Sequence, residues 1–118
     1  MDSAKDAEIR YENFLDEVEK NEVVYGLMLE DGLATWCDED QEKLIPFWSS
    51  IELAEAARVK HYEMYEVTEF PLSEFVEQVI PLLQKEEYWV GINWLESMTG
   101  VEISPESLLE ELSEQTVH

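Results

Sequence analysis

Carboxylates are the most abundant side chains in this sequence that could do chemistry. The chain of 118 residues holds 29 Asp and Glu, 2 His and 1 Cys. Two carboxylates can share general acid–base work, and several together can bind a cation. No pair is singled out by its neighbours, and the acidic segment 38–42 lacks the glycine and the ligand spacing of a calcium-binding loop. We therefore expect no metal site and no cofactor.

The other reactive residues lack the neighbours that catalysis requires. Cys37 has no helix start or basic residue close by to activate its thiol. Neither His61 nor His118 belongs to a ligand or triad pattern, and the 4 glycines form no phosphate-binding loop. The sequence predicts a protein that is not an enzyme.

Two series of acids recur every four residues, which places each series in one row along a helix. The rows are Glu8, Glu12 and Asp16 near the start of the chain, and Glu106, Glu110 and Glu114 near its end. Like charges at this spacing destabilise a helix by about 0.2–0.5 kcal/mol per pair, whereas a Lys in the row would stabilise it. The neighbours lie about 5–6 Å apart, a spacing comparable with that of phosphates along a nucleic-acid strand.

Further acids cluster outside the two rows. We predict that these further acids contact a basic partner together with the two rows. They are Glu19, Asp38, Glu39, Asp40, Glu63 and Glu66. An ordinary solvated helix face is the alternative interpretation of either row, and Glu106 also complements the dipole at its helix start. Adaptation of the whole surface to high salt is a third interpretation.

Hydrophobic periodicity defines the elements of the N-terminal half. A helix is predicted from Ser3 to about Lys20, and the β-rich segment Val23–Leu29 leads through a turn to a second strand at Leu33–Cys37. A short apolar run follows at Leu44–Trp48. Ser49 and Glu52 fit a capping box that opens a helix to about Lys60. The predicted inward residues of that helix are Ile51, Ala54 and Ala57.

The C-terminal half continues the alternation. An extended segment is expected to end at Pro71, and Ser73 is expected to cap a helix that Pro81 kinks. A last pair of strands is expected at residues 88–94 and 101–103. Ser104, followed by a proline, is typical of the start of a final helix. We predict a single acidic domain over residues 1–118 with an α+β fold, a mainly antiparallel sheet of about five strands with three to four helices packed against it.

The net charge of −22 is abnormal for a chain that otherwise has the composition of a globular protein. Hydrophobic residues make up 45% and aromatic residues 11%, too many for a disordered acidic tail. The same charge is carried by about 11 base pairs of DNA, roughly one turn of duplex. Such a surface repels nucleic acid and anionic lipid, so we expect a basic partner. No signal peptide or membrane-spanning segment is apparent, and we expect a cytoplasmic monomer.

Several short motifs occur along the chain in a fixed order. They are Arg10-Tyr11 with Phe14, Val24 to Leu27, Asp31-Gly32, Pro46 to Trp48, Ala54, Leu72 with Phe75, Pro81 to Leu83, Trp89 to Ile92, and Gly100-Val101 before Pro105. Their order resembles that in a family of small bacterial proteins that is known only as a domain of unknown function. The resemblance covers about residues 9–112 and implies a fold without an activity.

Size and charge carry a second resemblance, to the small acidic DNA-mimic proteins of the Neisseria type. Those proteins are monomeric α+β domains that occupy the DNA-binding face of the histone-like protein HU. The resemblance implies a non-catalytic DNA mimic that binds HU and competes with DNA. The alternative is an immunity-type inhibitor that blocks a basic nuclease toxin. An enzyme or small-molecule sensor would instead need a concave apolar pocket with convergent polar groups.

Overall fold

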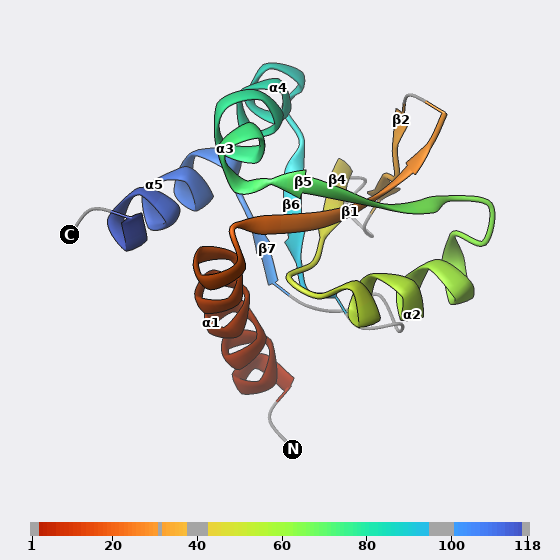
Figure 1. The fold of residues 1–118 in the computed structure, drawn as a ribbon, viewed down its shortest axis with the longest axis horizontal. Coiled ribbons are helices and arrows are strands. Elements are labelled where there is room, and N and C mark those ends of the chain that lie inside the picture. Colours follow the sequence, from red (N-terminus) through yellow and green to blue (C-terminus); the bar gives the residue numbers. More distant parts are fainter. Residues whose placement is uncertain (1–2, 31, 38–42, 95–100, 117–118) are drawn as a thin grey trace.

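Helices and strands alternate along the chain in the order that the sequence predicts, and the mixed α+β class is confirmed (Figure 1). The computed structural model describes residues 3–30, 32–37, 43–94 and 101–116. The elements are α1 (Ser3–Asn21), β1 (Val23–Leu29), β2 (Gly32–Leu33), β3 (Trp36–Cys37), β4 (Lys43–Phe47), α2 (Ile51–His61), β5 (Glu66–Pro71), α3 (Leu72–Glu74), the π-helical turn η1 (Phe75–Val79), α4 (Ile80–Glu86), β6 (Trp89–Ile92), β7 (Val101–Ile103) and α5 (Pro105–Thr116).

The strands form two small sheets, where the sequence predicts one sheet of about five strands. In the described part of the chain, the first sheet has the order β2-β1-β5 and the second the order β3-β4-β6-β7. Pairing is mainly antiparallel, as predicted, but β4 and β6 run parallel. A bridge between Tyr25 and Trp48, with two backbone hydrogen bonds of 2.8 Å, joins β1 to the end of β4.

The predicted strand Leu33–Cys37 is divided between these two sheets. Leu33 pairs with Met28 in the first sheet, and Trp36 pairs with Leu44 in the second. The backbone between them is engaged elsewhere, because the Thr35 carbonyl accepts a hydrogen bond of 3.1 Å from the Tyr62 hydroxyl. The chain therefore crosses from one sheet to the other at residues 34–35.

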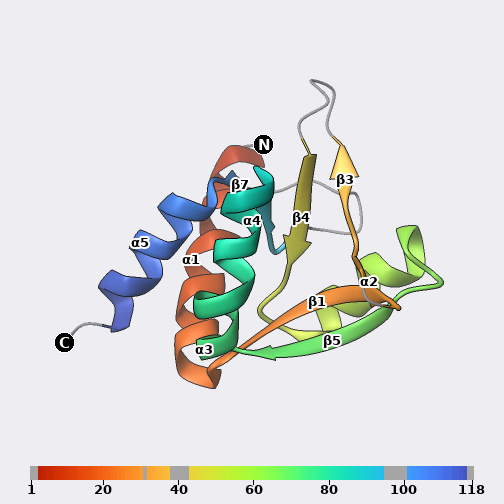
Figure 2. The ribbon, with the colours of Figure 1, turned by 90° about the horizontal axis from the view of Figure 1, so that it is seen from above.

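The helices form layers on opposite sides of the strands (Figure 2). On one side lie α1, α5 and the continuous helix of residues 72–86, and they bury a core that includes Phe14, Phe47, Phe75 and Leu108. On the other side α2 packs against β1 and β5. A second core there includes Leu27, Leu44, Trp48, Ala54, Ala57 and Trp94.

The start of α2 differs from the prediction by one residue. The N-cap is Ser50, whose hydroxyl accepts a hydrogen bond from the Leu53 N–H at 3.2 Å. Ser49 is instead buried and bonded to other elements. Ala54 and Ala57 face inward as expected, but Ile51 is 48% exposed because it lies in the first turn, on the outer side of the helix.

The helix of residues 72–86 also begins differently from the prediction. It starts at Leu72 after Pro71, and its first residue has no side-chain cap, so the expected cap at Ser73 is wrong. The disturbance expected at Pro81 takes the form of the π-helical turn just before it, in which the Ile80 N–H bonds to the Phe75 carbonyl. Pro81 has no N–H to donate to its preceding turn, which favours such a widened turn. The final helix begins as predicted, with the Ser104 hydroxyl accepting from the Ser107 N–H at 3.2 Å.

Candidate partner-binding surface

The row on α1 lies on the solvent side of an amphipathic helix. Phe14, Leu15 and Val18 are buried against the core, while Glu8, Glu12 and Asp16 are exposed. Among the described side chains, no Lys, Arg or His forms an ion pair with these three carboxylates. The row is therefore exposed, as the sequence predicts, and no ion pair within the described part of the chain offsets its repulsion.

The row on α5 has the same arrangement. Leu108 and Leu112 are buried, while Glu106 and Glu110 are exposed. Glu114 belongs to the same helix, but its side chain lies outside the part that the structure describes. This helix therefore contributes two carboxylates whose exposure is known.

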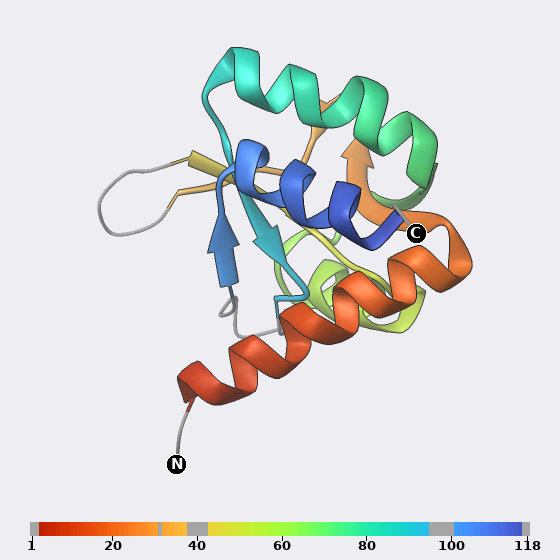
Figure 3. The same cartoon turned by 90° about the vertical axis from the view of Figure 1, so that its left-hand side faces the viewer.

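Packing between α1 and α5 places the two helices that carry the rows next to each other, on the same side of the strands (Figure 2). Figure 3 looks onto this side, where α5 lies between α1 and the helix of residues 72–86. Tyr11 of α1 lies at this junction. Burial and, to a smaller extent, the nearby carboxylate of Glu111 on α5 raise the pKa of Tyr11 to about 12. We call the exposed acids Glu8, Glu12, Asp16, Glu106 and Glu110 the acidic helical face.

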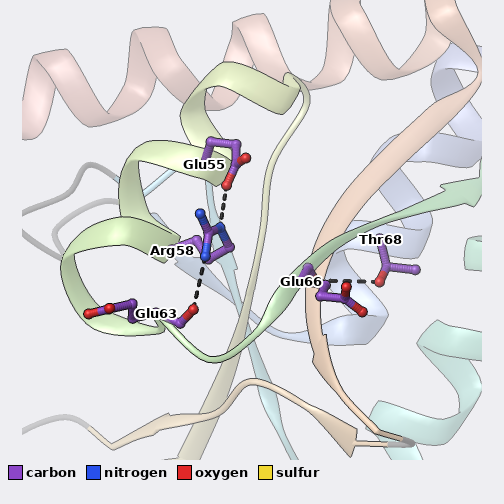
Figure 4. Close-up of polar contacts among 5 residues, drawn as sticks. All are labelled: Glu55, Arg58, Glu63, Glu66 and Thr68. Atoms are coloured by element: carbon purple, nitrogen blue, oxygen red, sulfur yellow. Dashed lines mark hydrogen bonds and ion pairs between the residues drawn. The ribbon is translucent and has the colours of Figure 1, made fainter.

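The remaining predicted contacts do not join this face. Glu19 of α1 is half-buried and already makes an interaction within the chain. Glu63 and Glu66 are exposed where the chain passes from α2 into β5, at the end of the molecule far from α5 (Figures 1 and 4). Asp38, Glu39 and Asp40 lie outside the described residues.

The backbone carbonyl of Glu63 is bonded to a cationic side chain. Arg58 forms an ion pair with Glu55 one turn earlier on α2, and its guanidinium donates a hydrogen bond of 2.9 Å to the Glu63 carbonyl (Figure 4). Within β5, the Thr68 hydroxyl donates a hydrogen bond of 3.5 Å to the Glu66 carbonyl. The Arg58 contact stabilises the connection between α2 and β5 through the backbone of Glu63.

A buried polar network fixes α1 onto the second sheet. Ser49 follows β4, Asn93 follows β6, and both are at least 97% buried. The Asn93 amide donates to the Arg10 carbonyl at 3.3 Å and to the Ser49 hydroxyl at 3.0 Å, and that hydroxyl donates to the Glu17 carboxylate at 2.5 Å. The contacts of Arg10 and Glu17 link α1 to the ends of the parallel strands, and the contact between Asn93 and Ser49 links those two ends to each other. The network holds the acidic row of α1 in a fixed position.

A groove of about 490 Å³ opens where the end of α1, the start of the helix of residues 72–86 and α5 meet. Its apolar lining consists of Pro71, Leu72, Val76 and Leu112, and its polar lining of Glu22, Ser73 and Glu77. This groove was not predicted from the sequence, because Val76 fits the ordinary spacing of one apolar helix stripe with Val79, Ile80 and Leu83.

In the part of the chain that the structure describes, no group of three His, Cys, Asp or Glu side chains is arranged to hold a metal ion. No described helix has both the length and the apolar character needed to cross a membrane.

Comparison with known proteins identifies the scaffold. No curated protein matches the chain. Residues 11–112 match the family described as "Protein of unknown function (DUF2750)". The match spans almost the whole of the predicted resemblance, from the middle of α1 to Leu112 of α5. The chain belongs to the DUF2750 family.

Proposed function

We propose that this protein is a DNA mimic, a non-catalytic acidic protein that occupies the DNA-binding surface of a basic protein and competes with DNA. The observation that carries the proposal is the acidic helical face. Its carboxylates come from two helices that are distant in sequence and adjacent in space, and no described cation neutralises them.

Charge and size agree with this role. A net charge of −22 corresponds to about 11 base pairs, which span roughly 37 Å along the duplex axis. The long dimensions of the molecule are 39 × 39 Å and the short one is 28 Å. The protein thus carries the charge of one turn of DNA within about the length of that turn.

The local energetics also favour a binding role over a purely structural one. Acids at four-residue intervals destabilise α1 and α5, and opposite charges at the same places would stabilise them. The sequence keeps the less stable choice on both helices of one face. Electrostatic attraction from such a face speeds association with a basic partner and weakens steeply with salt.

We propose histone-like HU as the partner, bound by a cytoplasmic monomer without a cofactor. The test is a pull-down with purified bacterial HU, followed by competition with duplex DNA at several salt concentrations. We expect a complex that DNA displaces and that dissociates as salt rises. If HU does not bind at low salt, or if DNA fails to displace it, the proposal is wrong.

A further inference from the structure

The groove at the edge of the acidic helical face combines an apolar floor with carboxylates at its rim. Leu72, Val76 and Leu112 supply the floor, and Glu22 and Glu77 are exposed beside it. Its volume of about 490 Å³ lies within the range of about 300–1,000 Å³ that is usual for binding pockets. A surface that only repelled anions would not need this apolar floor.

The backbone at the rim favours a residue other than glutamate. Glu22 follows α1 with a φ of 58°, in the left-handed region where glycine is the usual residue after a helix. A side chain in this conformation costs about 1–2 kcal/mol. The Glu22 carbonyl accepts a hydrogen bond of 2.9 Å from the Leu72 N–H, which ties this rim to the floor. A carboxylate is thus kept at the groove despite the local cost.

Charge decides which occupant the groove suits. A second copy of this chain would bring another 22 negative charges and is repelled. A purely basic surface would satisfy the rim but leave Leu72 and Val76 in contact with water. The matching occupant is a segment in which an apolar side chain is flanked by Lys or Arg.

We propose that the groove binds such a segment of the basic partner, with an apolar side chain on the floor and flanking cations at Glu22 and Glu77. This inference rests on the proposed function and adds burial of an apolar side chain to the electrostatic attraction between the two proteins. The electrostatic component of binding is screened by salt, whereas burial of an apolar side chain is not. Binding should therefore retain a preference for an apolar anchor at high salt.

The test uses two synthetic peptides of equal length and equal lysine content, one with leucines between the lysines and one with serines. Affinities are measured by fluorescence anisotropy at low and high salt. We expect the Lys/Leu peptide to bind at least about fivefold more tightly than the Lys/Ser peptide, with the ratio maintained at high salt. Equal affinities would overturn the proposal.

Matched variants on the helix of residues 72–86 locate the effect. Val76→Ser should bring the affinity ratio of the two peptides close to one, whereas Leu82→Ser removes an apolar side chain that is 51% exposed outside the groove and should leave the ratio unchanged. Glu77→Gln should lower the affinity for both peptides more than Glu86→Gln does, because Glu86→Gln removes the same charge outside the groove. Thermal unfolding checks that all four variants fold. Identical behaviour within either pair contradicts the proposal.

The two proposals fail separately. If HU binds and is displaced by DNA but the two peptides bind equally, only the groove is mistaken. If HU does not bind, the DNA-mimic proposal is lost whatever the peptides show.

Discussion

The backbone N–H of Ser49 donates a hydrogen bond of 2.8 Å to the side-chain oxygen of Asn93. This bond joins residues 44 positions apart, at the ends of the parallel strands β4 and β6. Both residues are buried, so neither polar group can turn to solvent. Because buried polar groups without partners are costly, each residue fixes the other.

Asn93→Ala should lower the free energy of unfolding by about 3 kcal/mol, since two terms add. The substitution leaves the Ser49 N–H without its acceptor, and it places an alanine at a φ of 46°, where asparagine is better tolerated. Urea unfolding of the wild-type and variant proteins measures the loss.

Asn93→Gly separates the two terms. Glycine adopts the positive φ freely but offers no acceptor, so this variant should be about 1 kcal/mol more stable than Asn93→Ala. Equal stabilities would show that backbone conformation contributes nothing at this position. Wild-type stability in both variants would show that the network contributes nothing either.

The same contact explains why the cap of α2 was predicted one residue too early. Ser49 and Ser50 are adjacent serines, and Ser49 with Glu52 has the local pattern of a capping box. In the folded chain Asn93 and Glu17 engage Ser49, which leaves Ser50 to cap the helix. The local pattern contains neither partner, because both lie far away along the chain.

Elements that depend on their own local sequence were predicted accurately, whereas arrangements that depend on distant residues were not. The bounds of α1 and β1 follow from the spacing of their own apolar residues and were predicted almost to the residue. The division of Leu33–Cys37 between two sheets depends on Tyr62 and on the pairing of β4 with β6, which periodicity does not encode. The α+β class was predictable, whereas the two-sheet arrangement was not.

The candidate site shows the same limit. Exposure of the two acidic rows was predictable, since Asp and Glu are almost never buried without a partner. Their presence on one face depends on the packing of α1 against α5. The groove needs three segments to meet, and Glu22, Val76 and Leu112 carry no shared sequence signal.

Alkaline pH should destabilise the protein through two tyrosines. Burial, with smaller contributions from Glu111 and Tyr65 respectively, raises the pKa of Tyr11 and of Tyr62 from 10.0 to about 12. Between these values the unfolded chain loses phenolic protons that the folded chain keeps, so stability falls as pH rises through this window. Below pH 10 both states are protonated, and these groups contribute no pH dependence.

Ultraviolet titration of tyrosinate measures this directly. Tyr11→Phe and Tyr62→Phe should each remove part of the absorbance change near pH 12, and each should flatten the decline of stability above pH 10. If either variant titrates with the wild-type profile, the raised pKa of that tyrosine is wrong.

Glu87→Gly should stabilise the protein by about 1 kcal/mol. Glu87 ends α4 with a φ of 60°, and its N–H bonds to the Gln84 and Leu83 carbonyls, an arrangement in which glycine is preferred. Glu86→Gly is the matched control, because it removes the same charge from within the helix and should destabilise it by up to about 1 kcal/mol. Thermal unfolding that shows the same sign for both changes would contradict the assignment of the strain to Glu87.

Lysine in either acidic row should raise stability while lowering affinity for the partner. Glu12→Lys places a cation four residues from both Glu8 and Asp16, and Glu110→Lys does the same between Glu106 and Glu114. Each change turns two repulsive spacings into attractive ones and should add about 1 kcal/mol to the free energy of unfolding. Chemical unfolding and HU binding are measured on the same samples.

Glu66→Lys separates a binding face from a general charge effect, because it makes the same change in net charge at the start of β5, far from α5 (Figure 1). If the acidic helical face binds the partner, Glu12→Lys and Glu110→Lys should weaken HU binding at least about tenfold, and Glu66→Lys should weaken it much less. Equal losses in all three variants would mean that HU senses only the total charge. More stable variants with unchanged binding would mean that the rows serve solubility, because acids that no partner contacts can be replaced without loss.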